Sequence, residues 1–139
     1  MRIAFAVLRY FPFGGLERDM LRMAETAASR GHHVVIHTSK WEDCALSEKN
    51  IEVKLLPLKS IANEQKFNEA VNKESFDVKV AFNRIGGCDF YFAADNCYAV
   101  DMPKKHPKWI LTLLPRYRTF LKLERNVFSP ACNTRIFYL

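Results

Sequence analysis

The sequence predicts an α/β protein with a Rossmann-like, doubly wound parallel sheet. A continuously apolar segment, residues 3–8, stands almost at the N-terminus, as expected of a strand buried on both faces of a parallel sheet. A turn containing Gly14 and Gly15 follows it, and an amphipathic helical pattern then leads to a second strand at residues 33–38. Strand, glycine turn, helix and strand in this order form a βαβ unit, whose short connections favour a doubly wound sheet.

The helix of this unit is predicted to follow Gly15 and to end at Gly31. Its apolar residues recur on one helical stripe, which comprises Leu16, Met20, Ala24, Ala27 and Ala28. Charged residues, Glu17 among them, occupy the polar positions. Gly31 suits the position just beyond a helix, where a left-handed backbone is common.

The rest of the chain continues the alternation of strands and helices. Further strands are predicted at residues 52–56, 78–82, 90–93 and 135–139, and helices at residues 62–73 and 108–128. Pro115 is expected to kink or divide the helix at residues 108–128. A strand that ends at the last residue has no following helix to cover it, so we expect residues 1–139 to be a single domain truncated from a longer protein.

Composition narrows the functional classes. A chain of 139 residues with 49% hydrophobic and 26% charged residues is sufficient for one packed domain, which excludes intrinsic disorder. Its net charge of +6 predicts an anionic partner surface, but no recognisable nucleic-acid-binding motif occurs. No segment approaches the roughly 20 apolar residues of a membrane span. Four scattered cysteines indicate reduced thiols in a cytoplasmic protein, with Cys97 a small buried residue.

Candidate chemical groups are predicted at the carboxyl edge of the sheet, where open α/β sheets bind ligands. Backbone N–H groups at Gly14 and Gly15 suit a phosphate or diphosphate, although an ordinary strand-to-helix turn has the same signature. Asp19 is placed to bind a substrate hydroxyl or simply to complement the helix dipole. Asp95 follows the strand at residues 90–93 and could orient or deprotonate an acceptor hydroxyl, or cap a turn. No metal site is predicted, because the histidines do not converge.

Most of the positive charge lies in one segment. Between Tyr98 and Arg125 there are seven Lys and Arg residues against two acids, which supplies five of the six net charges. On one continuous helix an apolar stripe would form, comprising Ile110, Leu113, Leu114, Tyr117, Phe120 and Leu121. The pattern favours an interfacial helix on an anionic bilayer, with a core helix bearing a solvated basic side as the alternative. The predicted membrane-binding residues are Lys104, Lys105, Lys108, Trp109, Arg116, Arg118, Lys122 and Arg125.

Several short motifs are more specific than these patterns. They are YFPFGGLERD at residues 10–19, RGHHV at 30–34, YFAAD at 91–95, CY at 97–98, RYR at 116–118 and ER at 124–125. Together they make the chain closely resemble, over essentially its whole length, the N-terminal domain of the lipopolysaccharide core glucosyltransferases. These enzymes are retaining, family-four glycosyltransferases of the GT-B fold.

The resemblance implies two Rossmann-like domains that face each other across a cleft, of which this chain is the N-terminal, acceptor-binding half. The expected activity is transfer of glucose, or a similar hexose, from a UDP-sugar to an inner-core heptose of lipopolysaccharide, with no metal or other cofactor. The expected location is the cytoplasmic face of the bacterial inner membrane, where the enzyme is peripheral.

The resemblance also implies roles for particular residues. Gly14 and Gly15 would contact the donor diphosphate, Asp19 would lie by the donor sugar or the acceptor, and Asp95 would be the acceptor-side carboxylate. Residues from 98 to about 128 match the family's membrane-interacting region. Because the C-terminal donor domain is absent, the chain alone is expected to be inactive. The alternative is a non-catalytic module that binds anionic membranes.

Overall fold

A computed structural model describes residues 1–42, 46–56, 63–94 and 96–138. At its centre is a six-stranded sheet in the order β3-β2-β1-β4-β5-β6, in which every neighbouring pair is parallel. The strands are β1 (Arg2–Ala6), β2 (His33–Thr38), β3 (Ile51–Leu55), β4 (Val78–Ala81), β5 (Phe90–Ala93) and β6 (Arg135–Tyr138). This topology confirms the predicted doubly wound, Rossmann-like fold.

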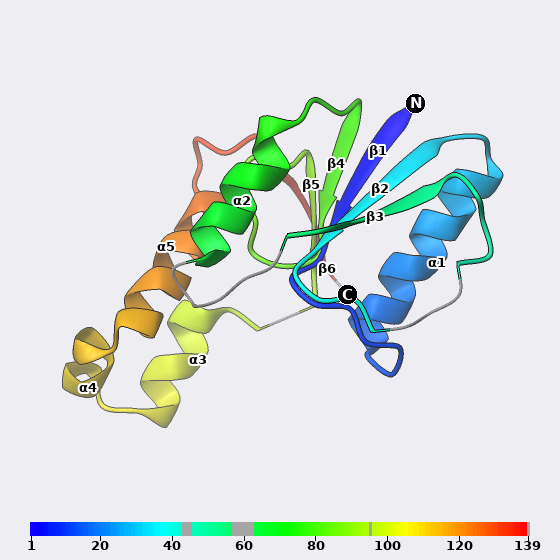
Figure 1. The fold of residues 1–139 in the computed structure, drawn as a ribbon. Helices are drawn as coiled ribbons and strands as arrows, with labels where there is room; N and C mark the ends of the chain where they lie inside the picture. The colour runs from blue at the N-terminus through cyan, green and yellow to red at the C-terminus, as the bar shows by residue number, and fades with distance from the viewer. Residues whose placement is uncertain (43–45, 57–62, 95, 139) are drawn as a thin grey trace.

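Helices cover both faces of the sheet (Figure 1). They are α1 (Gly15–Ser29), α2 (Asn63–Lys73), α3 (Tyr98–Lys105), α4 (Lys108–Leu113) and α5 (Pro115–Phe128). One apolar cluster joins α1 to one face through Met20 and Phe5. A second cluster joins α2 and α5 to the other face through Phe67 and Val127. The core therefore consists of two layers separated by the sheet.

Strand β1 shows why the first apolar segment has no polar alternation. Successive residues of a strand point to opposite faces of the sheet. Phe5 accordingly packs in the α1 cluster, and Ala6 packs in the cluster of α2 and α5. Both faces are covered, so each position is apolar.

The predicted stripe of α1 is confirmed, with one exception among its polar residues. Met20, Ala24 and Ala28 are buried, and Gly31 adopts a positive φ of 84° just beyond the helix. Glu17, predicted on the polar side, is instead only 8% exposed. The reason is its place in the first turn, where its carboxylate folds back over the Gly14 backbone.

The long helix predicted over residues 108–128 is two helices. Leu114 has an extended backbone, with φ −87° and ψ 112°, and Pro115 occupies the first turn of α5. A proline has no N–H to lose at this position, which makes it suitable for starting a helix. The expected division at Pro115 is confirmed, but the prediction of an apolar stripe along one continuous helix is wrong. Leu111 is buried instead, at 1% exposure.

The segment from α3 to the first turns of α5 extends away from the sheet (Figure 1). We call residues 98–122 the lobe. Helix α3 was not predicted from the sequence and contains Pro103. The ring of Tyr98 packs against Tyr117 and Phe120 of α5, at centroid distances of 5.7 and 5.1 Å. These aromatic contacts hold the first and last helices of the lobe together.

Candidate functional site

The loop after β1 is held at the carboxyl edge of the sheet by neighbouring loops. The N–H of Val7 donates to the carbonyl of His37 at 3.0 Å, and the N–H of Leu8 donates to Oδ1 of Asn83 at 2.7 Å. Further along, buried Tyr10 stacks on Trp41 with a centroid distance of 4.0 Å. The loop that leads to Gly14 and Gly15 is therefore tied to the ends of β2 and β4.

The two glycines of the turn have different surroundings. A Cβ atom on Gly14 would lie 1.8 Å from Oε2 of Glu17 and 2.8 Å from the ring of Phe11. At Gly15 no heavy atom lies within 4 Å of that position. The first N–H groups of any α-helix lack partners within the helix. The Glu17 carboxylate therefore covers Gly14, whereas the Gly15 side of the turn is open.

The two predicted aspartates differ in what the structure shows of them. Asp19 lies in α1, half-buried, four residues after Gly15 and so on the same side of the helix. Asp95 lies outside the described residues, so its predicted place beyond β5 stays a prediction. Ala93, the last residue of β5, is buried, and Asn96 is exposed.

A buried ion pair at the base of the lobe was missed by sequence reasoning. Glu124 of α5 is 4% exposed, and its Oε1 lies 3.2 Å from Nε of Arg84, in the loop after β4. The same carboxylate accepts the N–H of Tyr98 at 2.7 Å and of Ala99 at 2.8 Å. Glu124 belongs to the ER motif at 124–125, which was the only sequence signal for it.

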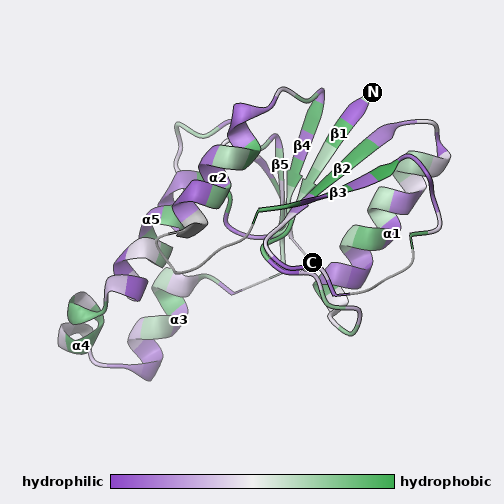
Figure 2. Cartoon of the chain, in the orientation of Figure 1, coloured by the Kyte–Doolittle hydropathy of each residue, from purple (hydrophilic) through white to green (hydrophobic). Residues whose placement is uncertain are grey.

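The predicted membrane-binding residues whose side chains are described are all exposed. Trp109 is 68% exposed and Leu113 of the same helix is 73% exposed. Figure 2 shows α4 as a largely hydrophobic segment at the far end of the lobe. The exposed cations of the lobe are Lys104, Lys105, Arg116, Arg118 and Lys122, and exposed Arg125 follows on α5. The side chain of Lys108 lies outside the described part.

Two buried titratable groups lie within the sheet region. Both ring nitrogens of His37 lack a hydrogen-bond partner among the described residues. Burial lowers the pKa of His37, an effect that the Glu74 carboxylate 3.8 Å away partly opposes. His37 is therefore neutral at neutral pH, so this contact is not an ion pair there. Burial also raises the pKa of the Cys88 thiol to about 12, which keeps it protonated.

Two further observations concern the cysteines and metal ligands. Cys97, expected to be buried, is exposed, and its Sγ lies 3.6 Å from Oε2 of Glu124. It precedes the first turn of α3 at the surface, where it has no core to fill. Among the described residues, no group of three or more His, Cys, Asp or Glu side chains is placed to hold a metal ion.

The helices of the structure differ from membrane-spanning helices. Within the described ranges, none has both the length and the apolar character needed to cross a bilayer. This agrees with the short lengths of α3 and α4.

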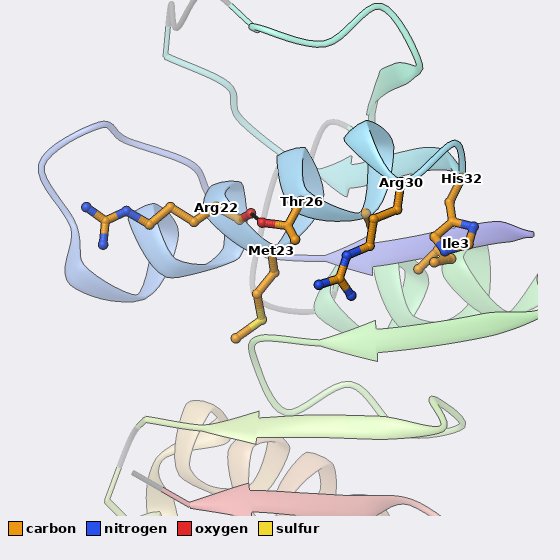
Figure 3. A pocket seen from close by; sticks show the side chains of 7 residues that line it. Ile3, Arg22, Met23, Thr26, Arg30 and His32 are labelled. Atoms are coloured by element: carbon orange, nitrogen blue, oxygen red, sulfur yellow. Dashed lines mark hydrogen bonds between the residues drawn. The ribbon is translucent and has the colours of Figure 1, made fainter.

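A hollow of about 410 Å³ along α1 lies away from the candidate site. Its lining includes Arg22 and Met23 of α1 and Arg30 at the end of that helix, together with Ile3 and His32 (Figure 3). Ile3 and His32 lie at the start of β1 and just before β2, at the amino edge of the sheet. The hollow therefore stands at the opposite edge from Gly14 and Gly15 and is not part of the site.

Comparison with known proteins places the geometry in context. No protein-family model matches the chain. The lipopolysaccharide glucosyltransferase WaaG of Escherichia coli (strain K12) is 38% identical over 147 aligned residues, covering all of this chain and 38% of the relative. The crystal structure of WaaG, a glycosyltransferase involved in lipopolysaccharide biosynthesis, matches with a TM-score of 0.85 and 37% identity, over 96% of this chain and 37% of that one.

These matches confirm the resemblance inferred from the motifs, as well as the fold class. The chain spans about 38% of the length of the relative it matches. The similarity therefore concerns one part of a longer enzyme.

Proposed function

We propose that this chain is the acceptor-binding and membrane-facing half of a glycosyltransferase of lipopolysaccharide core biosynthesis. The observation that carries the proposal is the similarity to WaaG, which covers the whole chain at 38% identity. The complete enzyme transfers glucose, or a similar hexose, from a UDP-sugar to an inner-core heptose. It needs no metal or other cofactor and works at the cytoplasmic face of the inner membrane.

The carboxyl edge of the sheet supplies the groups for this reaction. The open backbone at Gly15, with Gly14 beside it, receives the donor diphosphate through N–H groups of the first turn of α1. Asp19, on the same side of that helix, binds a hydroxyl of the donor sugar or of the acceptor. Asp95 orients the acceptor hydroxyl and accepts its proton as the new glycosidic bond forms, while the bond from the sugar to the diphosphate breaks and UDP leaves.

The chain holds only one side of the cleft in this proposal. Transfer requires that donor and acceptor be held together in one geometry, which supplies much of the rate. The partner domain therefore binds the rest of the UDP-sugar, and the chain alone is inactive.

A chimera tests the catalytic proposal. This chain replaces the aligned part of E. coli WaaG, and transfer of labelled glucose from UDP-glucose to heptose-terminated lipopolysaccharide is measured. The chimera is expected to be active, and its Asp95→Asn variant is expected to lose well over tenfold in turnover because the acceptor hydroxyl loses its base. A folded but inactive chimera, or an Asp95→Asn variant with normal turnover, would contradict the proposal.

The second candidate function is membrane binding without catalysis, and the exposed lobe favours it. Trp109 and Leu113 are exposed on α4, and the lobe also carries exposed cations, so both could enter an anionic bilayer together. Each cation near such a surface contributes about 1 kcal/mol. Both candidate functions predict membrane contact, whereas only the first predicts glucose transfer by the chimera.

Vesicle co-sedimentation tests the membrane contact. Replacing Arg118, Lys122 and Arg125 by Gln is expected to weaken binding to phosphatidylglycerol vesicles by roughly 100-fold, from about 1 kcal/mol for each cation. A matched control replaces three exposed cations far from this segment in the sequence, Arg22, Arg30 and Lys49, by Gln. An equal loss of vesicle binding in the two variants would show a response to net charge alone and would contradict the proposed membrane contact of the lobe.

A further inference from the structure

Glu124 stands where three separate segments meet. It lies on α5, while its bonding partners come from the loop after β4 and from the start of α3. Both carboxylate oxygens are used. Oε1 accepts from the N–H of Tyr98 and from Nε of Arg84, and Oε2 accepts from the N–H of Ala99.

Arg84 extends this arrangement to the loop that precedes α3. Its Nη2 donates to the carbonyl of Asn96 at 2.7 Å, while its Nε binds Glu124. The side chains of Arg84 and Glu124 are only 11% and 6% exposed. A planar guanidinium with several fixed donors can hold both acceptors at once, which a lysine ammonium does not do in the same geometry.

A buried ion pair of this kind is poorly explained by stability. Removing two charges from water costs several kcal/mol, and well-packed apolar residues often replace such pairs without loss of stability. The pair instead fixes the position of α3, because two backbone N–H groups and one guanidinium from different elements bind the same carboxylate. The N-cap residue of α3, Cys97, provides no side-chain cap for the helix. The Glu124 carboxylate takes over this role from a distant part of the chain.

We infer that Glu124, held by Arg84, is the positioning residue that fixes the start of α3 against α5 and the sheet, and so sets the orientation of the lobe. The inference rests on the proposed membrane contact, which it deepens. Helix α3 contributes exposed Val100 and the cations Lys104 and Lys105 to the lobe surface. With α3 fixed, these groups and α4 face the bilayer together.

The test compares Glu124→Gln with Glu69→Gln, an exposed position on α2 that loses the same charge. A glutamine has nearly the same shape, but its NH₂ group would face one of the two backbone N–H groups and could not accept from it. Amide exchange at Tyr98 and Ala99 is therefore expected to accelerate roughly tenfold in Glu124→Gln, since a donor is left unsatisfied. Exchange in β1 and β2 is expected to stay as in the wild type.

The same variants are then tested for binding to vesicles of equal parts phosphatidylglycerol and phosphatidylcholine. Electrostatics alone predicts tighter binding for both, because each has one more net positive charge. We expect Glu69→Gln to follow this rule and Glu124→Gln to bind more weakly than the wild type. An opposite change in two variants of equal charge is a result that charge alone does not produce.

Three results would overturn the inference. They are unchanged exchange at Tyr98 and Ala99, faster exchange throughout the sheet, and Glu124→Gln binding that matches Glu69→Gln. If the wild type fails to bind the vesicles, the membrane proposal falls, and the exchange comparison alone decides whether Glu124 holds α3. Should Glu124→Gln not fold, Arg84→Lys replaces it, with faster exchange expected only at residues 96–99.

Discussion

The sheet and the lobe use apolar residues in opposite ways. In β2, Val34, Val35 and Ile36 are fully buried, whereas Trp109 and Leu113 of α4 are 68% and 73% exposed. Burial of apolar side chains is the main stabilising contribution to a fold. Exposed ones gathered at one end of a molecule mark a surface for a partner. The sheet therefore carries most of the apolar burial, and the lobe carries the exposed apolar residues on which the proposed membrane contact rests.

The largest expected effect, and the sharpest test of this comparison, is at two leucines of α4 in the lobe. Leu111 is 1% exposed although it shares α4 with exposed Leu113. Leu111→Ala is expected to cost about 2–5 kcal/mol in free energy of unfolding, because it leaves a cavity. Leu113→Ala is expected to change stability by less than about 0.5 kcal/mol. Urea denaturation measures both, and equal costs would show that the lobe is packed like the core.

A smaller effect is expected at the turn that begins α1. Gly14→Ala places a methyl group where Oε2 of Glu17 lies, so the Glu17 side chain must turn out toward solvent. The expected cost is about 1 kcal/mol, since the obstructing atoms belong to the Glu17 side chain and the exposed Phe11 ring, both of which can move, and alanine is a poor N-cap. Gly15→Ala meets no atom within 4 Å and serves as the control. Thermal denaturation measures both, and a destabilised control would contradict the different surroundings described for the two glycines.

The smallest effect concerns pH and belongs to the sheet region. The pKa of His37 is lowered from 6.5 by burial, so the unfolded chain takes up a proton at a higher pH than the folded one. Stability is therefore expected to fall as the pH drops below 6.5. The pKa of Glu74 is lowered from 4.5, chiefly by its hydrogen bond from Lys54, which adds a further loss at more acidic pH.

His37→Leu checks the assignment of the first step. Denaturation of this variant is expected to show a flatter dependence of stability on pH just below 6.5 than the wild type. An unchanged dependence would assign the proton uptake to another group.

Sequence reasoning located the sheet because its signals are local. The strand at 33–38 matches β2, and Gly31 ends α1 where a left-handed backbone was expected. Patterns of three to eight residues report burial directly when both faces of a sheet are covered. The lobe was less predictable. Helix α3 depends on a carboxylate 26 residues away from Tyr98, and no local pattern reveals such a contact.

The features of the candidate site were also predictable only where they have a local sequence signature. The Gly14 and Gly15 turn was found from residue type and position, since an anion-binding turn has a local signature. The burial of Glu17 was missed, because a carboxylate in a first helical turn has the same pattern whether it is solvated or folded back. Position after the strand at residues 90–93 left Asp95 with two readings, a carboxylate for an acceptor hydroxyl or a turn cap, and the family resemblance favoured the first; its role remains a prediction.

The break between α4 and α5 has a consequence for how such a protein can change over generations. Leu114 is extended and Pro115 starts a new helix, so α4 is joined to its neighbours without a continuous hydrogen-bonded ladder. Among the side chains of α4 that the structure describes, Leu111 alone is buried. Under the proposed membrane contact, substitutions at the exposed positions of α4 would alter attraction for a bilayer while the rest of the molecule keeps its folding energy. In that proposal, membrane affinity and folding become traits that selection adjusts separately.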